Sequence, residues 1–354
     1  MRDITVLMTG CGAPGAYGII KCLRKNGERN IRIIGVDMNE NAGARDMVDV
    51  FDLVPPAASD DFIDAVLAIC KAEKVDVVLP IVTRELMKFS LNRDRFEAVG
   101  TKVSVMKPET LEIVNNKAHL LTALKVAGIP TPEFIVAHTA DEVEAACYSL
   151  GFPNGPVCVK CAVGNGSRGV RILDFTVSKY DLFFNQKPNS MYISFSELME
   201  TLRERDEIPE MLVMEFLPGV EYSVDIIMQQ GLPHGVVIRR GLSVLTSNMI
   251  SLVIEDNADI AEYAIHAAQA VGADGNFGFD LLLNREGEPR IIEMNPRLTG
   301  GVVACSAAGV NLPYLGVKQM LGESFPSCLP VYGTRMFRRY QERFFAPDGS
   351  PIDW

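Results

Sequence analysis

The residues that most clearly indicate chemistry lie near the end of the sequence, in GFDLLLNREGEPRIIEMNPR. The turn signal NREGEP separates two apolar runs, so this stretch predicts a β-hairpin with Asp280 on one arm and Glu293 and Asn295 on the other. Residues two apart on a strand share a face. If the register sets Asp280 opposite this pair, their oxygens suit Mg²⁺ or Mn²⁺ shared with substrate phosphates. A hairpin with a merely solvated polar face is the alternative.

Two lysines and a glycine-rich loop provide groups that can bind phosphates. Lys160 lies in the strand-like run VCVKCAV, where a buried ammonium group needs an anionic partner. Lys117 begins a predicted helix. In the loop GNGSRG, at 164–169, glycines allow close approach of backbone N–H groups to a phosphate. Taken alone, this loop is equally compatible with an ordinary flexible hairpin, and the Walker pattern does not occur in the sequence.

An extended segment between these blocks has features of a nucleoside-binding hinge. The stretch is VMEFLPGVEYSVDI, residues 213–226. Its backbone N–H and C=O groups can pair with the edge of an adenine, and Glu221 can accept hydrogen bonds from ribose hydroxyls. By itself the segment is weak evidence, because any acidic strand looks similar.

The N-terminal end points to a different chemistry. A strand-like run precedes TGCGAPGAYG, in which Gly10, Gly12 and Gly15 have the G-x-G-x-x-G spacing of a dinucleotide-binding loop. The second run, IRIIGVD, ends on Asp37, near the place where a dehydrogenase keeps its ribose-binding acid. This spacing alone does not exclude a nicotinamide enzyme.

Composition restricts the class of protein. The chain has 354 residues, of which 48% are hydrophobic and 22% charged, as in a globular protein of two or three domains. A net charge of −11 argues against broad nucleic-acid binding. No apolar run is long enough to predict a membrane span, and the first residues have no signal-peptide pattern, so a cytoplasmic location is expected.

Cysteine and histidine usage gives little support for a metal or redox site built from these residues. Cys158 and Cys161 form the one C-x-x-C pair, in a strand-like run where residues three apart point to opposite faces. Small buried thiols are therefore favoured over a redox or metal pair. The four histidines are not clustered, so the sequence does not indicate a zinc site.

The elements that must position these residues follow three patterns. Up to about residue 115, apolar runs alternate with helical stretches, which is typical of βαβ units and a parallel sheet. A helix, a proline-stiffened turn and two strands joined by the glycine loop follow. From residue 213 onward, long alternating strands with turn signals predict an antiparallel sheet. The fold class is therefore α/β and α+β, beginning with a Rossmann-like parallel-sheet domain at 1–115.

Taken in order, these blocks resemble the ATP-grasp superfamily, and within it the carbamoyl phosphate synthetase large-subunit branch. The similar stretches are NNKAHLLTALKVAGIPTP, VKCAVGNGSRGV and EMNPRLTGG, and the resemblance extends to about residue 325. It implies a two-lobed ATP-grasp fold after the first domain. The small lobe with a phosphate lid would occupy 116–212, and the large lobe with the metal-binding hairpin 213–354. It also implies that the first glycine loop holds no dinucleotide.

The resemblance implies ATP and Mg²⁺ (or Mn²⁺) as cofactors, and it assigns roles to individual residues. The metal ligands would be Asp280, Glu293 and Asn295. The nucleotide-binding residues would be Lys117, Lys160, Gly164, Gly166, Ser167, Gly169, Glu215, Phe216, Leu217 and Glu221. The catalytic residues would be Lys160, Asn295 and Arg297, with Arg297 stabilising the transferred phosphoryl group. Arg239 or Arg240 would add a further positive charge.

The implied reaction activates a carboxylate as an acylphosphate, which an amine then attacks. A complete carbamoyl phosphate synthetase uses two phosphorylating halves, whereas this chain has one set of motifs. A stand-alone carboxylate–amine ligase is therefore expected. The alternatives are a synthetase-like subunit that needs a partner and an ATP-binding paralogue without activity. The expected partners are a small carboxylic acid and an amine, not nucleic acid or a membrane. The sequence does not identify the two substrates or the oligomeric state, for which a homodimer is one possibility.

Overall fold

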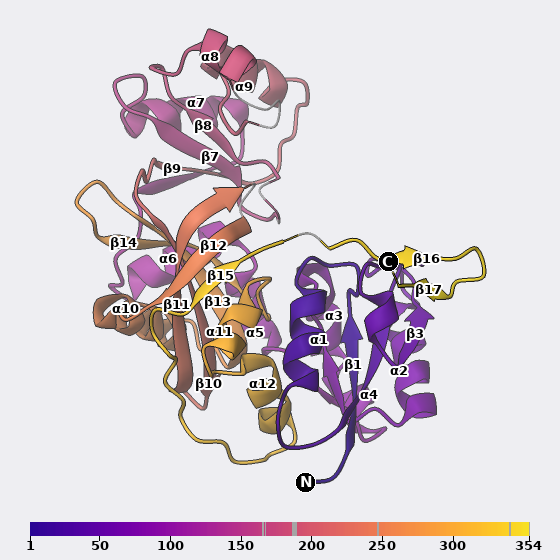
Figure 1. Ribbon diagram of the computed structural model, residues 1–354. Helices are drawn as coiled ribbons and strands as arrows, with labels where there is room; N and C mark the ends of the chain where they lie inside the picture. Colours follow the sequence, from indigo (N-terminus) through magenta and orange to yellow (C-terminus); the bar gives the residue numbers. More distant parts are fainter. Residues whose placement is uncertain (165, 167, 186–189, 246–247, 340, 354) are drawn as a thin grey trace.

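The computed structural model describes residues 1–164, 166, 168–185, 190–245, 248–339 and 341–353. Their strands form a five-stranded, a six-stranded and a four-stranded sheet, with a two-stranded ribbon near the C-terminus (Figure 1). Within these ranges no helix combines the length and the apolar character that a membrane span requires.

The first sheet is parallel, with strand order β3-β2-β1-β4-β5. Its central strands are almost fully buried, because helices cover both faces of the sheet. The predicted parallel-sheet α/β domain is therefore confirmed. In chain order the elements are β1 (Ile4–Thr9), α1 (Ala16–Arg24), β2 (Ile31–Asp37), the 3-10 helix η1 (Arg45–Met47), β3 (Val50–Leu53), α2 (Phe62–Glu73), β4 (Val77–Leu79), α3 (Thr83–Leu91), α4 (Arg93–Glu97) and β5 (Lys102–Val103).

The four-stranded sheet forms a separate lobe at the top of Figure 1, with strand order β6-β9-β7-β8. Strands β7 and β8 are antiparallel neighbours on either side of the glycine loop, as the sequence predicts. The elements leading to and forming this lobe are α5 (Pro108–Val114), α6 (Lys117–Val126), β6 (Phe134–Ala137), α7 (Ala140–Ser149), β7 (Val157–Cys161), β8 (Arg171–Leu173), α8 (Lys179–Asn185), α9 (Phe195–Leu202) and β9 (Met211–Glu215).

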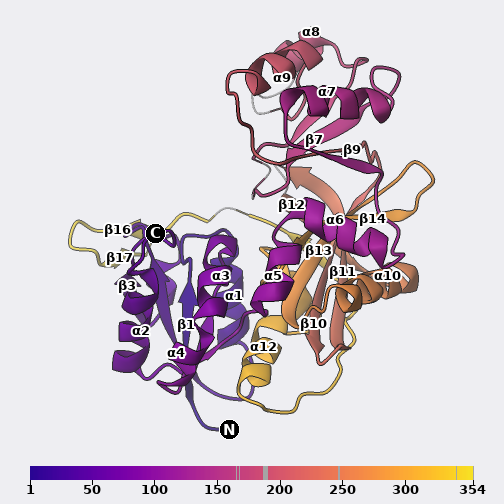
Figure 2. The ribbon, with the colours of Figure 1, turned by 180° about the vertical axis from the view of Figure 1, so that it is seen from behind.

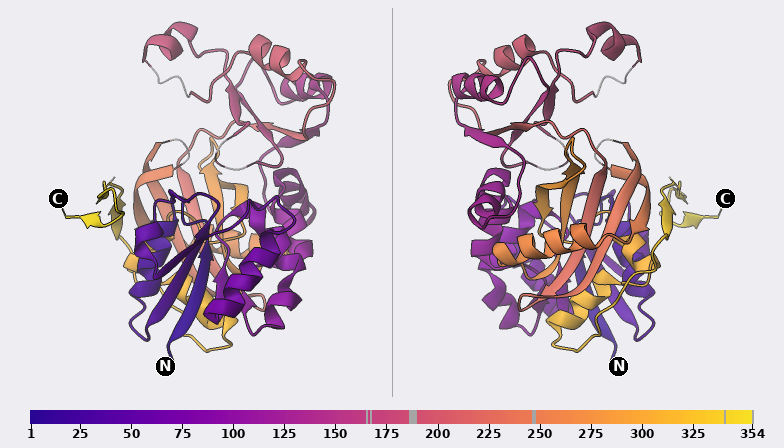
Figure 3. Two further views of the ribbon diagram at one scale, coloured as in Figure 1. Left: turned by 90° about the vertical axis from the view of Figure 1, so that its right-hand side faces the viewer. Right: turned by 90° about the vertical axis from the view of Figure 1, so that its left-hand side faces the viewer.

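The six-stranded sheet is antiparallel, with strand order β14-β13-β10-β11-β12-β15. Helix α10 packs on one face, and α11 and α12 lie on the other (Figure 3). The antiparallel sheet expected from residue 213 onward is confirmed from β10 on, but Met211–Glu215 forms β9 of the four-stranded sheet instead. Its elements are β10 (Glu221–Gln229), β11 (Leu232–Leu245), β12 (Asn248–Glu255), α10 (Ala258–Ala270), β13 (Gly275–Leu283), β14 (Pro289–Asn295), α11 (Val302–Ala307), α12 (Leu312–Met320) and β15 (Arg335–Phe337).

The parallel-sheet domain and the large antiparallel sheet share one hydrophobic core. Ile19 of α1 belongs to the same buried cluster as Val302 of α11 and Leu312 of α12. At the edge of this contact, Lys318 Nζ donates hydrogen bonds to the carboxylate of Glu28, at 2.8 and 3.1 Å. Because the buried cluster is continuous, the two sheets keep a fixed relative position.

Helix α6 packs against both antiparallel sheets. Leu121 faces the apolar cluster of the four-stranded sheet, whereas Leu120 and Leu124 belong to the core of the six-stranded sheet. The helix therefore joins the two lobes, and the residue at its first turn lies between them.

The C-terminal segment returns to the parallel-sheet domain. After β15 the chain crosses from the large sheet to the opposite side of the molecule, where β16 (Phe344–Phe345) and β17 (Pro351–Ile352) form a ribbon (Figures 1 and 2). Arg343 forms an ion pair there with Asp46, at 3.2 Å. The segment thus connects the large sheet with the parallel-sheet domain.

The N-terminal glycine loop is explained by packing and turn geometry. Gly10 has a φ of +66°, and the Gly12 N–H donates to Asp37 Oδ2 at 2.7 Å. A Cβ on Gly15 would lie 2.9 Å from Gly300 Cα, in the segment before α11. A positive φ and such close backbone contact both favour glycine. The spacing typical of a dinucleotide loop here serves a tight turn and the contact between α1 and the large lobe.

We predict that Gly15→Ala destabilises the protein, because the new methyl group would meet backbone atoms that cannot move independently. Overpacking of this kind lowers the free energy of unfolding by about 1–3 kcal/mol. The matched control is Gly43→Ala, where the structure places no atom within 4 Å of the added Cβ. Thermal melting of both variants tests this; equal melting temperatures would refute the packing explanation.

Candidate active site

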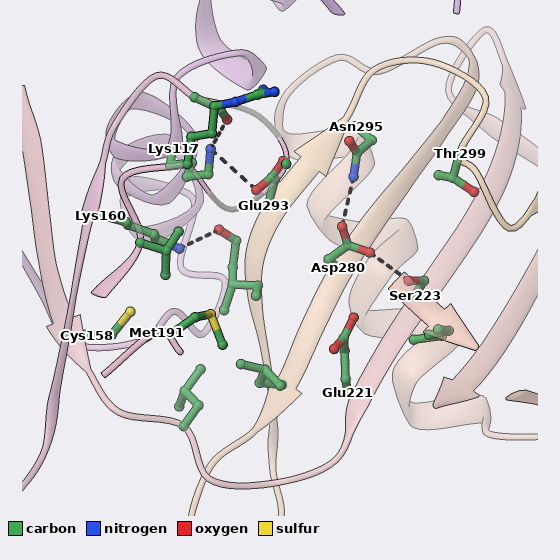
Figure 4. A pocket seen from close by; sticks show the side chains of 18 of the residues that line it. Lys117, Cys158, Lys160, Met191, Glu221, Ser223, Asp280, Glu293, Asn295 and Thr299 are labelled. Carbon is green, nitrogen blue, oxygen red and sulfur yellow. Dashed lines mark hydrogen bonds and ion pairs between the residues drawn. The ribbon is translucent and has the colours of Figure 1, made fainter. Parts of the chain in front are cut away.

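A cavity of about 510 Å³ lies between the small and large antiparallel lobes, a size typical of ligand sites (Figure 4). The sequence-predicted residues that line it are Lys117, Lys160, Gly164, Gly166, Glu215, Phe216, Leu217, Glu221, Asp280, Glu293, Asn295 and Arg297. Blocks that lie far apart in the sequence therefore meet in one cavity.

Two predicted residues of the glycine loop stand apart from this set. Ser167 lies outside the described residues. Gly169 is not among the residues that line the cavity. It has a φ of +72°, and a Cβ there would lie 2.6 Å from Cys161 Sγ. Packing of the loop against β7 explains this glycine without any direct phosphate contact.

Lys117 connects the glycine loop to the hairpin. Asn116 caps α6 by accepting hydrogen bonds from the N–H groups of the first turn, which fixes where the Lys117 side chain begins. Lys117 Nζ donates to the Gly164 carbonyl at 2.8 Å and lies 3.4 Å from Glu293 Oε2 (Figure 4). One ammonium group therefore contacts both lobes.

Lys160 lies deeper in the cavity, on β7. Its Nζ donates to the Ile292 carbonyl at 3.0 Å, and burial lowers the pKa of Lys160. The pairing of β13 with β14 shifts after Asp280, so that Ile292 is the extra residue of a β-bulge. A bulge frees a backbone group from the ladder, and here the freed carbonyl faces the lysine.

The hairpin brings its predicted polar residues together. Asp280 is directly opposite Glu293 in the strand register, as the metal-site hypothesis required. Asp280 accepts hydrogen bonds from Ser223 Oγ at 2.7 Å and from Asn295 Nδ2 at 2.8 Å (Figure 4). Burial, with the nearby Glu293 carboxylate, raises the pKa of Asp280 to about 6. The carboxylates thus repel each other and create a site that favours a cation.

The donor set fits a divalent cation shared with a substrate. The described residues contain no group of three or more His, Cys, Asp or Glu side chains that could enclose a metal. Asp280 and Glu293 supply two carboxylates, and Asn295 supplies an amide. Mg²⁺ is commonly bound by one or two carboxylates while substrate phosphates and water complete its octahedron.

Arg297 is oriented by the parallel-sheet domain and by residues of its own lobe. Its Nε donates to Thr83 Oγ1 of the parallel-sheet domain at 3.1 Å, and its Nη1 to the Leu298 carbonyl at 2.9 Å. Its Nη2 donates to Asn295 Oδ1 at 3.3 Å. Burial lowers the pKa of Arg297, and Asp280 opposes this effect. The sequence does not indicate Thr83, because the contact joins residues more than two hundred positions apart.

The structure decides between Arg239 and Arg240. Arg239 lines the cavity, donates from Nε to Asp225, and donates from Nη2 to Thr299 Oγ1 at 3.0 Å. Arg240 forms an ion pair with Glu255 instead. The signal that indicates Asp225 in the sequence is the two-residue spacing of Glu221, Ser223 and Asp225, which places polar groups on one face of β10.

The remaining end of the cavity is more apolar. Cys158, Met191 and Met214 line it. Cys158 and Cys161 are free thiols in different apolar clusters, on opposite faces of β7 as predicted.

The Glu215 carboxylate accepts a hydrogen bond from the Glu133 N–H at 3.0 Å, so its side chain stabilises the sheet edge. The backbone of 215–217 remains beside the cavity.

Two family models match separate parts of the chain. Residues 207–338 match a family described as ATP-grasp in the biosynthetic pathway with Ter operon. Residues 6–104 match a PylC-like N-terminal domain. The first match contains the hairpin, and the second contains the parallel sheet.

The chain also resembles curated proteins. It is 28% identical over 202 residues to the uncharacterized protein y4rH of Sinorhizobium fredii, covering 54% of this chain and 38% of that protein. It is 27% identical over 231 residues to the carbamoyl phosphate synthase large chain of Rubrobacter xylanophilus, covering 64% and 21%. With the D-alanine–D-alanine ligase of Neisseria meningitidis it shares 25% identity over 197 residues, covering 52% and 58%. The chain thus spans between about a fifth and three fifths of these relatives.

Solved structures share the fold over nearly the whole chain. An ADP complex of N5-carboxyaminoimidazole ribonucleotide synthetase superposes with a TM-score of 0.68 at 16% identity, covering 93% of this chain and 79% of that one. An L-amino acid ligase from Bacillus licheniformis gives 0.63 at 19% identity, covering 91% and 75%. Residues 207–338 therefore match an ATP-grasp domain, and the chain as a whole shares the fold of these solved structures.

We predict that Glu221→Gln changes the pH dependence of stability of the ligand-free protein. Burial, with a contribution from Asp280, raises the pKa of Glu221 from 4.5 to about 7. Between these values the folded state binds more protons than the unfolded state, so stability falls as pH rises through this window. The glutamine of the variant does not titrate in this window. The melting temperature of the variant should therefore exceed that of the wild type at pH 8, and the difference should be smaller at pH 5.

The control is Glu200→Gln, which removes a carboxylate from an exposed position of α9. This variant should follow the wild-type pH profile. An equal gain for Glu221→Gln at both pH values would contradict the raised pKa.

Proposed function

We propose that this protein is an ATP-dependent ligase that activates a carboxylate as an acylphosphate and joins it to an amine. The observation that carries the proposal is the convergence of Lys117, Lys160, Asp280 and Glu293 in one cavity. Phosphoryl transfer needs cationic groups and metal-binding carboxylates around the transferred group, and it needs no enzyme nucleophile. The solved and curated relatives named as ligases support the same reaction class.

In this proposal ATP lies along the cavity, with its adenine in the apolar end beside the backbone of 215–217. Glu221 binds the ribose, and Lys117 and Lys160 contact the phosphates. The loop at 164–169 covers the phosphates through its backbone. The domain division into 1–115, 116–212 and 213–354 remains a prediction from the sequence, and so does a cytoplasmic location. A homodimer is one of the oligomeric states that the sequence leaves open.

Asp280, Glu293 and Asn295 are the residues that would hold Mg²⁺ or Mn²⁺. When bound, such an ion supplies positive charge that offsets the charge of the phosphate oxygens. Without it, the hydrogen bonds of Asp280 to Ser223 and Asn295 keep the carboxylate oriented toward the cavity.

The proposed reaction has two displacements. A substrate carboxylate oxygen attacks the γ-phosphorus, and the bond from that phosphorus to the bridging oxygen breaks, releasing ADP. The amine nitrogen then attacks the acyl carbon, the carbon–oxygen bond to phosphate breaks, and the nitrogen loses a proton. Arg297, held by Thr83 and the Leu298 carbonyl, stabilises the negative charge on the transferred phosphoryl group.

A phosphate-release screen tests this proposal. Candidate carboxylic acids are paired with amino acids and ammonia in the presence of Mg²⁺ and ATP. We expect one class of acid–amine pair to stimulate ADP and phosphate release, with the amide product detected by mass spectrometry. Turnover that requires bicarbonate, ammonia and a second protein would instead identify a synthetase subunit, and nucleotide binding without turnover a non-catalytic paralogue.

We predict that the protein binds Mg-ATP and not NAD(H). The N-terminal glycine loop is packed against the large lobe at Gly15 and Gly300, and its acid, Asp37, accepts the Gly12 N–H. The cavity with the lysines lies elsewhere. Calorimetric titration with each nucleotide is the measurement; tight NADH binding together with no heat from Mg-ATP would refute the proposed function.

We predict that Glu293→Gln lowers ATP turnover on the order of 100-fold or more, because it removes a carboxylate that would hold the metal ion against the phosphates. The ligand-free fold should be retained. The substitution weakens the pair with Lys117, but it also relieves repulsion with Asp280 directly opposite. Turnover and melting temperature are measured on the same sample.

The same hairpin provides the control. Glu288→Gln removes an exposed carboxylate that pairs with Arg290 and does not line the cavity. It should leave turnover unchanged. Near-wild-type turnover of Glu293→Gln would remove this residue from the site, and a collapse of its melting temperature would make the Lys117 pair structural.

A further inference from the structure

Beyond the hairpin, the cavity ends in a group of guanidinium side chains. Arg239, Arg297 and Arg338 line this end together with Thr299, Gly300 and Gly301. Figure 4 shows Thr299 on the far side of Asp280 and Asn295 from Lys117 and Lys160. If phosphates lie at the lysines, this end faces the acid that is to be phosphorylated.

Arg338 is the member of this group with the fewest partners. It belongs to the C-terminal segment, directly after β15. Its Nη2 donates to the Gly300 carbonyl at 3.1 Å. Its Nε is buried and has no hydrogen-bond partner, and the guanidinium is in no ion pair, among the residues that the structure describes. An unpaired buried donor is costly, so a ligand acceptor there would be bound favourably.

Arg239 contacts Gly301, the glycine that follows Gly300. A Cβ on Gly301 would overlap Arg239 Nη1, so the guanidinium lies directly on the backbone of this residue. Asp225, which is buried, is the carboxylate that pairs with Arg239. Arg239 and Arg338 therefore flank two consecutive glycines. Asp225 pairs with Arg239, whereas Arg338 has no carboxylate partner among the residues that the structure describes.

We infer that the carboxylic acid substrate carries a second carboxylate, held by Arg338 beside Gly300 and Gly301. This inference rests on the proposed function, because it names the substrate class of that site. One carboxylate is phosphorylated near Arg297, and the other pairs with Arg338. A guanidinium matches a carboxylate in shape, and the single charge of the Arg338 guanidinium balances a carboxylate rather than a doubly charged phosphate ester. The substrate class is a dicarboxylic acid.

Binding measurements test this without depending on turnover. The protein is saturated with Mg²⁺ and a non-hydrolysable ATP analogue. It is then titrated calorimetrically with aliphatic dicarboxylates from malonate to adipate, and with monocarboxylates of the same chain lengths. We expect at least one dicarboxylate to bind about 10-fold or more tightly than its monocarboxylate, as for a charge-assisted hydrogen bond.

Variants assign the difference to one side chain. Arg338→Gln should abolish the preference for the dicarboxylate, and Arg338→Lys should retain part of it. Both should bind the ATP analogue as the wild type does. The matched control is Arg335→Gln, three residues earlier on β15, where the side chain is exposed and does not line the cavity. This control should keep the full preference.

Several outcomes would overturn the inference. These are equal affinity for both classes of acid, no binding of any dicarboxylate, and tighter binding of a phosphorylated acid. A fourth is that Arg338→Gln binds the ATP analogue more weakly than the wild type does but binds ADP equally well. This result would assign Arg338 to the γ-phosphate. Dicarboxylate binding without phosphate release for any amine would support the subsite and refute the ligase. Phosphate release with monocarboxylates alone would support the ligase and refute the dicarboxylate subsite.

Discussion

The contact of Lys117 with Gly164 and Glu293 is the interaction on which the site depends most. Its ammonium group is largely buried between two lobes, so it must find acceptors in both. The capped start of α6 fixes the side chain, and the packing of α6 on both sheets fixes the helix. The glycine loop and the hairpin that carries Glu293 are therefore held at a distance set by one side chain.

The parallel-sheet domain is part of the site even though most of the cavity lies elsewhere. It shares a buried core with α11 and α12 and approaches Gly300 through Gly15. From this fixed position Thr83 accepts a hydrogen bond from Arg297. Orientation of this side chain by a neighbouring domain reduces the conformational freedom that it would lose when a ligand binds.

Charge is distributed unevenly in this acidic protein. Although the net charge is −11, several cationic side chains line one cavity. They include Lys117, Lys160, Arg239, Arg297 and Arg338. The buried carboxylates Asp225 and Asp280 compensate part of this charge, and anionic ligands compensate the rest. A buried charge without such partners would be expensive, so the cavity favours anionic ligands.

Local patterns are enough to predict the hairpin with Asp280, Glu293 and Asn295 on its arms and a parallel sheet followed by an antiparallel one, because two-residue and helical periodicities are local properties of the chain. The fold was needed to show which of Arg239 and Arg240 enters the cavity, that Thr83 orients Arg297, and that Arg338 arrives from the C-terminal segment. It also assigned the first glycine loop to packing against Gly300. These contacts join segments that are distant in the sequence. They depend on bulges and close backbone approaches, which produce no periodic pattern of residues that could be recognised beforehand.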